Sequence, residues 1–481
     1  MARQIDAIFV NSPLKDYGAE PRHNDFTLPV LGLGYIATSA RTAGFNVGVL
    51  DVESLGLSIS AAAALINEVH PRWVGLNLLA PTYKLSVGLL ALFDEDIAVM
   101  LGGHQAKAMP FEILADARIN RVDALVLGEG DHRVAALLED GSADLPNVLR
   151  RGSGAGSMAV QRPDNGTLLA PDLDTLPIVD RTFFAADPFL AADGRVEASM
   201  VGSRGCPYDC SFCGAAVSAN PDIRIRTRSP ANLLQELDDL HGRYGVTAVR
   251  FVDDLFLAHL RFMGDCLTAF VKEGVGDRFV WDATGRINIL DRADDAILDL
   301  MVRSGCREVA LGIESGSERM LKHIDKRITP QMTQRVVRRL TARGIHVKGY
   351  FILGLPTETR DEMRATTSLV RDLWSIGDSS EGNFRASVFE FRPYPGTPDW
   401  HRLMATGNYT AEQLLAYEHI DLTQQGADPA MRERDEFNFS SNVQFGEATI
   451  REVRAALTEV TAEQDARRMV VTRARPVTSV P

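Results

Sequence analysis

Hydrophobic residues in the first third of the chain form short runs, separated by longer amphipathic stretches. Runs of this length are typical of buried strands. Five of them are expected to form strands, at 7–10, 47–50, 73–79, 97–101 and 124–127. The stretches between them, 33–43 and 59–69 for example, repeat their apolar residues at helical spacing. This alternation predicts an α/β domain with a doubly wound parallel sheet.

A second alternation of the same kind begins near residue 198. Six strands are expected, at 199–202, 248–252, 280–283, 308–312, 347–353 and 387–391. Amphipathic helices are expected between them, at 230–244, 294–304, 330–343 and 360–373. Two expected helices, 411–417 and 447–468, follow in a polar tail. The chain is therefore predicted to hold two α/β domains and a helical end.

Glycines gather where the strands of the first sheet end. Gly32 and Gly34 follow the first expected strand, Gly102 and Gly103 the fourth, and Gly128 the fifth. Ligands of open parallel sheets bind at this edge, and glycine lets the backbone approach a ligand closely. A G-x-G-x-x-G motif does not follow the first strand, so a dinucleotide is not expected there.

Length and charge narrow the class of protein. The 481 residues suggest about three domains, and a net charge of −13 argues against nucleic acid as the main partner. No apolar run reaches the length of a membrane-spanning helix, and the start resembles no secretory signal. We expect a cytoplasmic protein that does not bind membranes.

Three of the five cysteines, Cys206, Cys210 and Cys213, stand together in a C-x₃-C-x₂-C pattern. A structural zinc site takes four ligands, and no cysteine or histidine pair completes one. An odd cysteine count in a long chain also argues against disulfides. A four-iron cluster normally takes four cysteines, so three predict a [4Fe-4S] cluster with one iron open to a ligand. Cys266 and Cys306 are expected to be buried, with Cys306 at the start of a strand.

This triplet, with Phe212 before its last cysteine, resembles the cluster loop of the radical S-adenosylmethionine (SAM) superfamily. The resemblance implies that the second domain is a partial (β/α)₆ TIM-type barrel. It also implies that SAM binds the open iron and that one electron releases a 5′-deoxyadenosyl radical from it. The required reductant would be a flavodoxin or a ferredoxin.

The first domain resembles the Rossmann-like cobalamin-binding domain of some radical SAM enzymes. The likeness rests on Asn77-Leu78-Leu79, on Gly102-Gly103 and on Gly128-Glu129-Gly130. The Asp-x-His-x-x-Gly motif that supplies a histidine to cobalt is absent, and Asp239-x-His241 is off by one residue. The resemblance therefore implies base-off cobalamin without a protein histidine ligand. Thr82 and Tyr83 would then face the cobalt, and His104 would lie at the surface or near the nucleotide tail.

The same resemblance assigns residues of the barrel to SAM. Asp253 or Asp254 would contact its amino group, and Arg286 its carboxylate. Glu314, followed by Ser315, stands at the ribose-binding position of the family. The segment 354–357 would shape the adenine pocket. Tyr394 is a candidate to line the substrate cavity, although a rigid turn explains its surroundings better.

Together these features predict four regions and one activity. The regions are a cobalamin-binding domain (1–150), a linker (151–190), a radical SAM barrel (191–400) and a mostly helical C-terminal region (401–481). The expected activity is transfer of a methyl group from methylcobalamin to an unactivated carbon of a small biosynthetic intermediate. A non-methylating enzyme with the same cofactors, which would catalyse cyclisation or ring contraction, is one alternative. A non-enzymatic cobalamin or redox sensor is the other.

Overall fold

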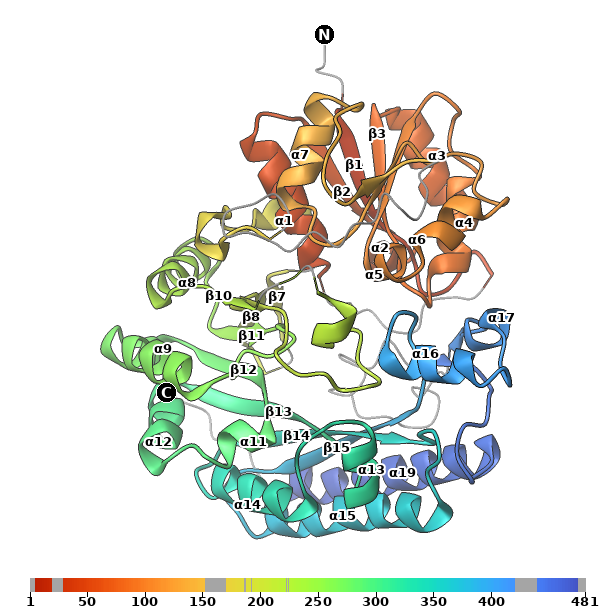
Figure 1. The fold of residues 1–481 in the computed structure, drawn as a ribbon. Coiled ribbons are helices and arrows are strands. Elements are labelled where there is room, and N and C mark those ends of the chain that lie inside the picture. The colour runs from red at the N-terminus through yellow and green to blue at the C-terminus, as the bar shows by residue number, and fades with distance from the viewer. Residues whose placement is uncertain are drawn as a thin grey trace. The chain divides into compact units, whose positions relative to one another are not determined.

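The computed structural model describes residues 5–19, 29–151, 170–185, 187–191, 193–221, 223, 225–419 and 439–474. The chain divides into two compact units, shown in Figure 1. The first unit holds Met1–Phe256 together with Pro393–Ala411. The second holds Leu257–Arg392 and Glu412–Pro481. Of the predicted linker, residues 152–169 and 186 lie outside the described residues.

A six-stranded sheet forms the amino-terminal part of the first unit, in the order β2-β1-β3-β4-β5-β6. Its strands are β1 (Ala7–Asn11), β2 (Val47–Asp51), β3 (Trp73–Asn77), β4 (Ala98–Gly102), β5 (Ala124–Val126) and β6 (Val148–Leu149). All neighbours are parallel except β5 and β6. The doubly wound sheet is therefore confirmed, with an unpredicted antiparallel edge strand.

Helices pack on both faces of this sheet and bury separate apolar cores. They are α1 (Leu31–Thr42), α2 (Val52–Leu55), α3 (Ile59–Val69), α4 (Tyr83–Leu90), α5 (His104–Ala108), α6 (Pro110–Ala115) and α7 (Asp131–Glu139). Val10, Leu76 and Leu101 face one core, while Phe9, Trp73 and Met100 face the other. Because side chains alternate along a strand, the continuous apolar runs of the sequence supply both cores.

The first unit also contains the start of the barrel. Its elements are β7 (Phe189–Leu190), β8 (Val196–Met200), β9 (Ser203–Arg204), β10 (Arg226–Thr227), α8 (Pro230–Tyr244), β11 (Ala248–Phe251) and α16 (Pro398–Ala405), with the 3₁₀ turns Leu173–Thr175, Arg181–Phe183 and Val217–Ala219. Strand β8 pairs with β11 in parallel and with β7 in antiparallel orientation. Strands β9 and β10 form a separate antiparallel pair.

The second unit contributes four more barrel strands, in the order β15-β14-β13-β12. They are β12 (Val280–Gly285), β13 (Cys306–Glu314), β14 (His346–Leu353) and β15 (Phe384–Glu390), all parallel to their neighbours. The helices are α9 (Leu260–Lys272), α10 (Val275–Arg278), α11 (Ile287–Leu290), α12 (Asp295–Arg303), α13 (Glu318–His323), α14 (Pro330–Thr341) and α15 (Arg360–Asp378). Serine, threonine or aspartate caps the amino-terminal ends of α12, α13, α14 and α15. These side chains are preferred there because their oxygens accept hydrogen bonds from free backbone N–H groups.

Helix α19 (Ile450–Ala474) packs along β15. The buried side chain of Gln464 accepts a hydrogen bond from the Ala386 N–H and donates one to the Ala386 carbonyl. One amide side chain thus satisfies backbone groups that an edge strand otherwise leaves open. The helical C-terminal region is confirmed, but the helix expected at 411–417 is wrong in extent. Helix α17 (Ala411–Leu414) is short, and β16 (Glu418–His419) pairs with β17 (Phe439–Ser440).

The loop after β14 is held by one buried carboxyl group, that of Glu358. Its Oε2 atom accepts a hydrogen bond of 2.7 Å from the Gly354 N–H. Its backbone carbonyl accepts another from Glu447. Burial raises the pKa of Glu358 to about 7, although the hydrogen bonds from Gly354 and Leu355 act in the opposite direction. The folded protein therefore keeps a proton here that the unfolded chain releases at lower pH.

This proton gives the first prediction. Between the unfolded pKa near 4.5 and the folded value near 7, Glu358 makes the protein less stable as the pH rises. Glu358→Gln keeps the acceptor for Gly354 but removes the titration. We expect the variant to gain on the order of 2–3 kcal/mol over the parent protein between pH 4.5 and pH 8, measured by urea unfolding. Substitution of the exposed Glu381 by Gln is the control, and a pH-independent difference for Glu358→Gln would contradict this account.

Candidate active site

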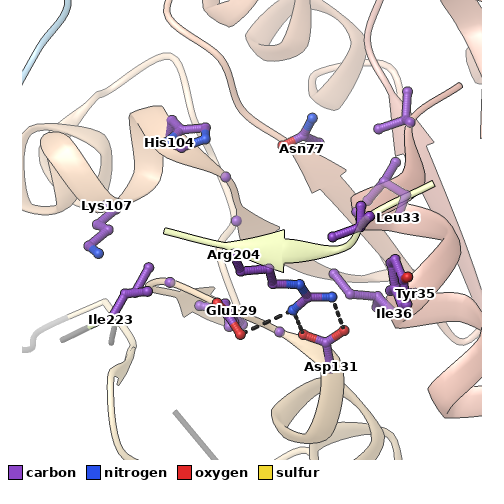
Figure 2. Close-up of a pocket in the computed structure, with 18 of the residues that line it drawn as sticks. Leu33, Tyr35, Ile36, Asn77, His104, Lys107, Glu129, Asp131, Arg204 and Ile223 are labelled. Atoms are coloured by element: carbon purple, nitrogen blue, oxygen red, sulfur yellow. Dashed lines mark hydrogen bonds and ion pairs between the residues drawn. The ribbon is translucent and has the colours of Figure 1, made fainter. Parts of the chain in front are cut away.

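A cavity of about 440 Å³ lies within the first unit, where strands β1, β3, β4 and β5 end. One wall comes from the sheet domain and includes Asn77, Gly103 and Glu129. The facing wall comes from the start of the barrel and includes Arg204 and Cys206. Figure 2 shows Asn77, His104, Glu129 and Arg204 around this space. A single cavity thus joins the glycine-rich edge of the sheet to the cysteine loop.

Gly103 has a backbone conformation that residues other than glycine rarely adopt, with a φ of +98°. A Cβ atom at this position would lie 2.4 Å from Asn77 Oδ1 and 2.6 Å from the Leu78 carbonyl oxygen. The backbone of Gly103 therefore fits into the turn after β3, where a side chain would push the wall apart. This close approach is the physical reason for a glycine at position 103.

His104 begins α5 and exposes its surface to the cavity. The protein that surrounds the ring lowers the pKa of His104 by desolvation, while the nearby charge of Asp254 acts in the opposite direction. Desolvation favours a neutral imidazole, because the charged form loses its water. His104 and Asp254 both line the cavity, one from each wall.

The cysteine loop enters the cavity wall at Cys206, while Cys210 is buried and Cys213 is half-buried. The pKa of Cys213 is raised to about 12, mainly by burial, and the charges of Cys210, Asp254 and Cys206 act in the same direction. Their mutual influence shows that the three sulfurs share one neighbourhood. In the described part of the chain, no three Cys, His, Asp or Glu side chains converge as ligands of a single metal ion. Each cysteine of an iron–sulfur cluster binds a different iron, so a cluster does not require the three sulfurs to converge on one metal ion.

Two aspartates after β11 support this loop. Asp253 is buried, and its Oδ1 accepts hydrogen bonds from the backbone N–H groups of Gly202, at 2.8 Å, and Ser203, at 2.6 Å. Burial raises its pKa to about 7 against the effect of these bonds. Asp254 accepts from the backbone of Gly205, and burial raises its pKa as well. Both line the cavity, but Asp253 is also the buried anchor of the segment before the cysteines.

Apart from the cysteines, most of the predicted site residues of the first unit line the cavity, but five do not. Those that line it are Asn77, Gly102, Gly103, His104, Gly128, Glu129, Asp253 and Asp254. Those outside its lining are Leu79, Thr82, Tyr83, Phe212 and Tyr394. Tyr83 donates its hydroxyl hydrogen bond to Asp116 instead, at 2.9 Å. The backbone carbonyl of Tyr394 accepts two hydrogen bonds from Thr397, which makes it part of a turn.

A second polar group lies at the end of β13, inside the second unit. Lys326 Nζ forms an ion pair with Glu314 Oε1 at 2.6 Å, and both side chains are buried. Arg286 donates to the backbone carbonyl of Lys326 at 2.6 Å. Glu314 has a φ of +66°, a strained conformation that other contacts must maintain. A Cβ on Gly312 would lie 2.3 Å from Glu314 Oε1, so this glycine makes room for the pair.

Sequence reasoning missed Lys326 and placed Ser315 differently. Lys326 lies between Asp325 and Arg327, which both have positive φ, so no helical or strand pattern marked it. The Ser315 hydroxyl is within 3.2 Å of Thr366 Oγ1 and accepts from the Ser317 N–H. It therefore helps to hold the loop after Glu314.

Family comparisons agree with this geometry. Residues 23–138 match the family model of the B12 binding domain, and residues 200–370 match that of the radical SAM superfamily. An uncharacterised methyltransferase of Pyrococcus horikoshii, PH0819, is 29% identical over 82% of this chain and 83% of its own. The anaerobic magnesium-protoporphyrin IX monomethyl ester cyclase of Rubrivivax gelatinosus is 24% identical over 80% and 72%. The structure of the radical SAM methyltransferase TsrM from Kitasatospora setae, 18% identical, covers 85% of this chain and 78% of its own, with a TM-score of 0.61.

The fold and the site thus define a radical SAM enzyme that carries a B12-binding domain. The chain carries the two domains that cobalamin-dependent radical SAM enzymes combine, and its relatives include methyltransferases. Its cofactors are a [4Fe-4S] cluster, SAM and cobalamin, and enzymes of this class use a reductant and a small-molecule substrate. No helix in the described residues is both long and apolar enough to cross a membrane.

The close fit of Gly103 gives the second prediction. Gly103→Ala combines a positive φ with contacts under 3 Å, so the wall must shift. We expect this variant to bind cobalamin at least about tenfold more weakly, which corresponds to a loss of roughly 1.4 kcal/mol in binding free energy. An equilibrium titration of the apoprotein measures this affinity. Gly48→Ala, in β2 with nothing within 4 Å of the added atom, should bind like the parent protein. Equal affinity in both variants would show that this wall does not contact cobalamin.

Proposed function

We propose that this chain is a methyltransferase that moves a methyl group from cobalamin to an unactivated carbon of a small biosynthetic intermediate. One observation carries the proposal: Gly103 and Cys206 line the same cavity. A cobalamin domain and a cluster loop that share a cavity can act on a single substrate. The greater identity to a methyltransferase than to the cyclase favours methyl transfer over the other reactions of relatives.

The residues of the cavity fit part of cobalamin, the edge of the cluster and the amino group of SAM. Cavities of this size hold small ligands, so this one would enclose part of cobalamin, such as its nucleotide tail, rather than the whole molecule. When bound, the cluster and SAM supply a carbon-centred radical, and cobalamin supplies the methyl group. In the net reaction, hydrogen leaves one substrate carbon and a methyl group takes its place.

The chain's own part in this chemistry is to bind, orient and exclude water. Cys206, Cys210 and Cys213 would hold the cluster, and the burial of Cys210 would keep water from one side of it. The Asp254 carboxylate suits the cationic amino group of SAM, because charge-assisted hydrogen bonds are strong. In the second unit, Glu314 would accept hydrogen bonds from the ribose hydroxyls. Arg286 and Lys326 are the cationic groups beside it that suit the carboxylate of SAM.

The lower face of cobalt is expected to lack a protein ligand. His104 is a histidine that lines the cavity, and it lies at the start of α5 beside Gly103, where a nucleotide tail would pass. We propose that it contacts the tail and that cobalamin binds base-off. An electron donor of the flavodoxin or ferredoxin class would reduce the cluster.

The state of cobalt gives the third prediction. The electron paramagnetic resonance spectrum of protein-bound cob(II)alamin should show no nitrogen splitting of its cobalt lines, because neither a histidine nor the benzimidazole base binds the metal. His104→Gln should leave this spectrum unchanged. A three-line splitting that disappears in His104→Gln would instead identify His104 as the ligand.

The activity gives the fourth prediction, which needs no substrate. Anaerobic protein with all three cofactors and a strong reductant should form both S-adenosylhomocysteine, from methylation of cobalamin, and 5′-deoxyadenosine. The triple variant C206A/C210A/C213A should lose 5′-deoxyadenosine by more than about a hundredfold while it still binds cobalamin, since the cavity glycines remain. 5′-Deoxyadenosine without S-adenosylhomocysteine would favour a non-methylating radical enzyme. Formation of neither product would favour a sensor.

A further inference from the structure

The cysteine loop, residues 205–214, is held at three separate places by side chains of the first unit. One restraint lies just before the loop, one just after it and one in its middle. Two of the three partners belong to the sheet domain that forms the opposite cavity wall. The position of the loop relative to that wall is therefore set by identifiable contacts.

The first restraint is Arg204, two residues before Cys206. Its guanidinium donates to Glu129 Oε2 at 3.0 Å and to both carboxylate oxygens of Asp131 at 2.8 and 3.1 Å. Arg226, which faces Arg204 across the β9–β10 pair, also contacts Glu129. The guanidinium lies 4.8 Å from the Tyr35 ring centre. Figure 2 shows Arg204 reaching Glu129 and Asp131.

The second restraint is Asn220, after the last cysteine. Its amide nitrogen donates to the carbonyl oxygens of Gly214, at 2.8 Å, and Ala216, at 3.0 Å. Its amide oxygen accepts a 3.0 Å hydrogen bond from Lys107 Nζ, on helix α5 of the sheet domain. Asn220 thus connects the end of the loop with the helix that begins at His104.

The third restraint is Asp399 on helix α16. Its Oδ2 accepts a 2.8 Å hydrogen bond from the Ser211 hydroxyl, and its N–H donates to the Ser211 carbonyl at 2.9 Å. Asp399 is buried. The turn before α16 passes close to α5, because a Cβ on Gly396 would lie 3.1 Å from Ala108 Cβ.

These contacts are strong for physical reasons. Asp131 is 4% exposed and Arg204 is 17% exposed, so their ionic hydrogen bonds are poorly screened by water. Three restraints at different points along a short loop leave it little freedom to rotate or shift. Lys107, Glu129, Asp131, Arg204 and Asn220 all line the cavity, so the same groups join its two walls.

We propose that Asp131 and Lys107 are positioning residues that, through Arg204 and Asn220, hold the cysteine loop at a fixed place against the cobalamin wall. This inference rests on the proposed function only in one respect, namely that one wall binds cobalamin and the other binds the cluster. Its consequence is that the cluster and cobalt keep one separation, so that the radical forms where the methyl group is available. Neither residue touches the reacting atoms.

The direct test uses hydrogen exchange in the cofactor-free protein. Asp131→Asn and Lys107→Met should each speed exchange of backbone amides within residues 203–220 by about tenfold or more, because a lost charge-assisted bond lowers the cost of local opening. Asp187→Asn is the matched control: Asp187 is buried in the same unit, and in the described part of the chain it bonds Arg181 and the Ser199 N–H, which lie outside the loop. It should leave exchange within 203–220 unchanged.

Lys107→Met should fold even if Asp131→Asn does not, because Lys107 is only half-buried and its substitution removes a peripheral contact. Parent-like exchange of the loop in both variants would overturn the proposal. So would faster exchange spread evenly over the whole unit, since that is the effect of lower stability alone.

A second measurement follows the bound groups. In protein that holds the one-electron-reduced [4Fe-4S]⁺ cluster together with cob(II)alamin, so that both centres are paramagnetic, their magnetic coupling should change or broaden in Asp131→Asn and Lys107→Met, but not in Asp187→Asn. Coupling that is identical in all three variants would contradict the positioning role. If the parent protein forms no 5′-deoxyadenosine, the proposed function fails, while the exchange data still decide whether the loop is held.

Discussion

The ionic contact of Arg204 with Asp131 and Glu129 holds the two walls of the cavity together. These residues come from elements far apart in the sequence, and their pairing joins the glycine-rich sheet edge to the cysteine loop. A buried guanidinium needs full compensation of its charge, and the two carboxylates provide it. The cavity, the position of Cys206 and the access of His104 to the cavity are all features of walls that this contact holds together.

Burial also disfavours ionised side chains in the site before the cofactors bind. Cys213, Asp253 and Asp254 all have pKa values raised by desolvation. A thiol binds iron as the thiolate, so assembly of the cluster must release protons from this region. Positive groups such as the iron of the cluster or the amino group of SAM then stabilise the charges that burial opposed.

Much of the fold could be predicted from the sequence, because apolar runs and helical periodicity report burial directly. Helices 59–69 and 230–244 have the predicted bounds, and Cys306 begins a strand. The glycines at 102 and 103 could also be assigned to the ligand edge, since their position after a strand has a geometric meaning. Arg204, Lys107 and Lys326 could not be found in this way. Their roles arise from contacts between distant segments, and no local pattern distinguishes them from surface cations.

The central claim is that cobalamin and the cluster occupy facing walls of one cavity in the first unit. Anomalous diffraction at the iron and cobalt edges, from crystals of the reconstituted protein, tests this directly. We expect iron peaks at Cys206, Cys210 and Cys213, and one cobalt peak beyond the carboxyl ends of β1, β3 and β4. The nucleotide tail of the bound cobalamin should lie beside Gly103. A cobalt peak elsewhere on the protein, or a bound cluster with no cobalt site at this edge of the sheet, would contradict the account.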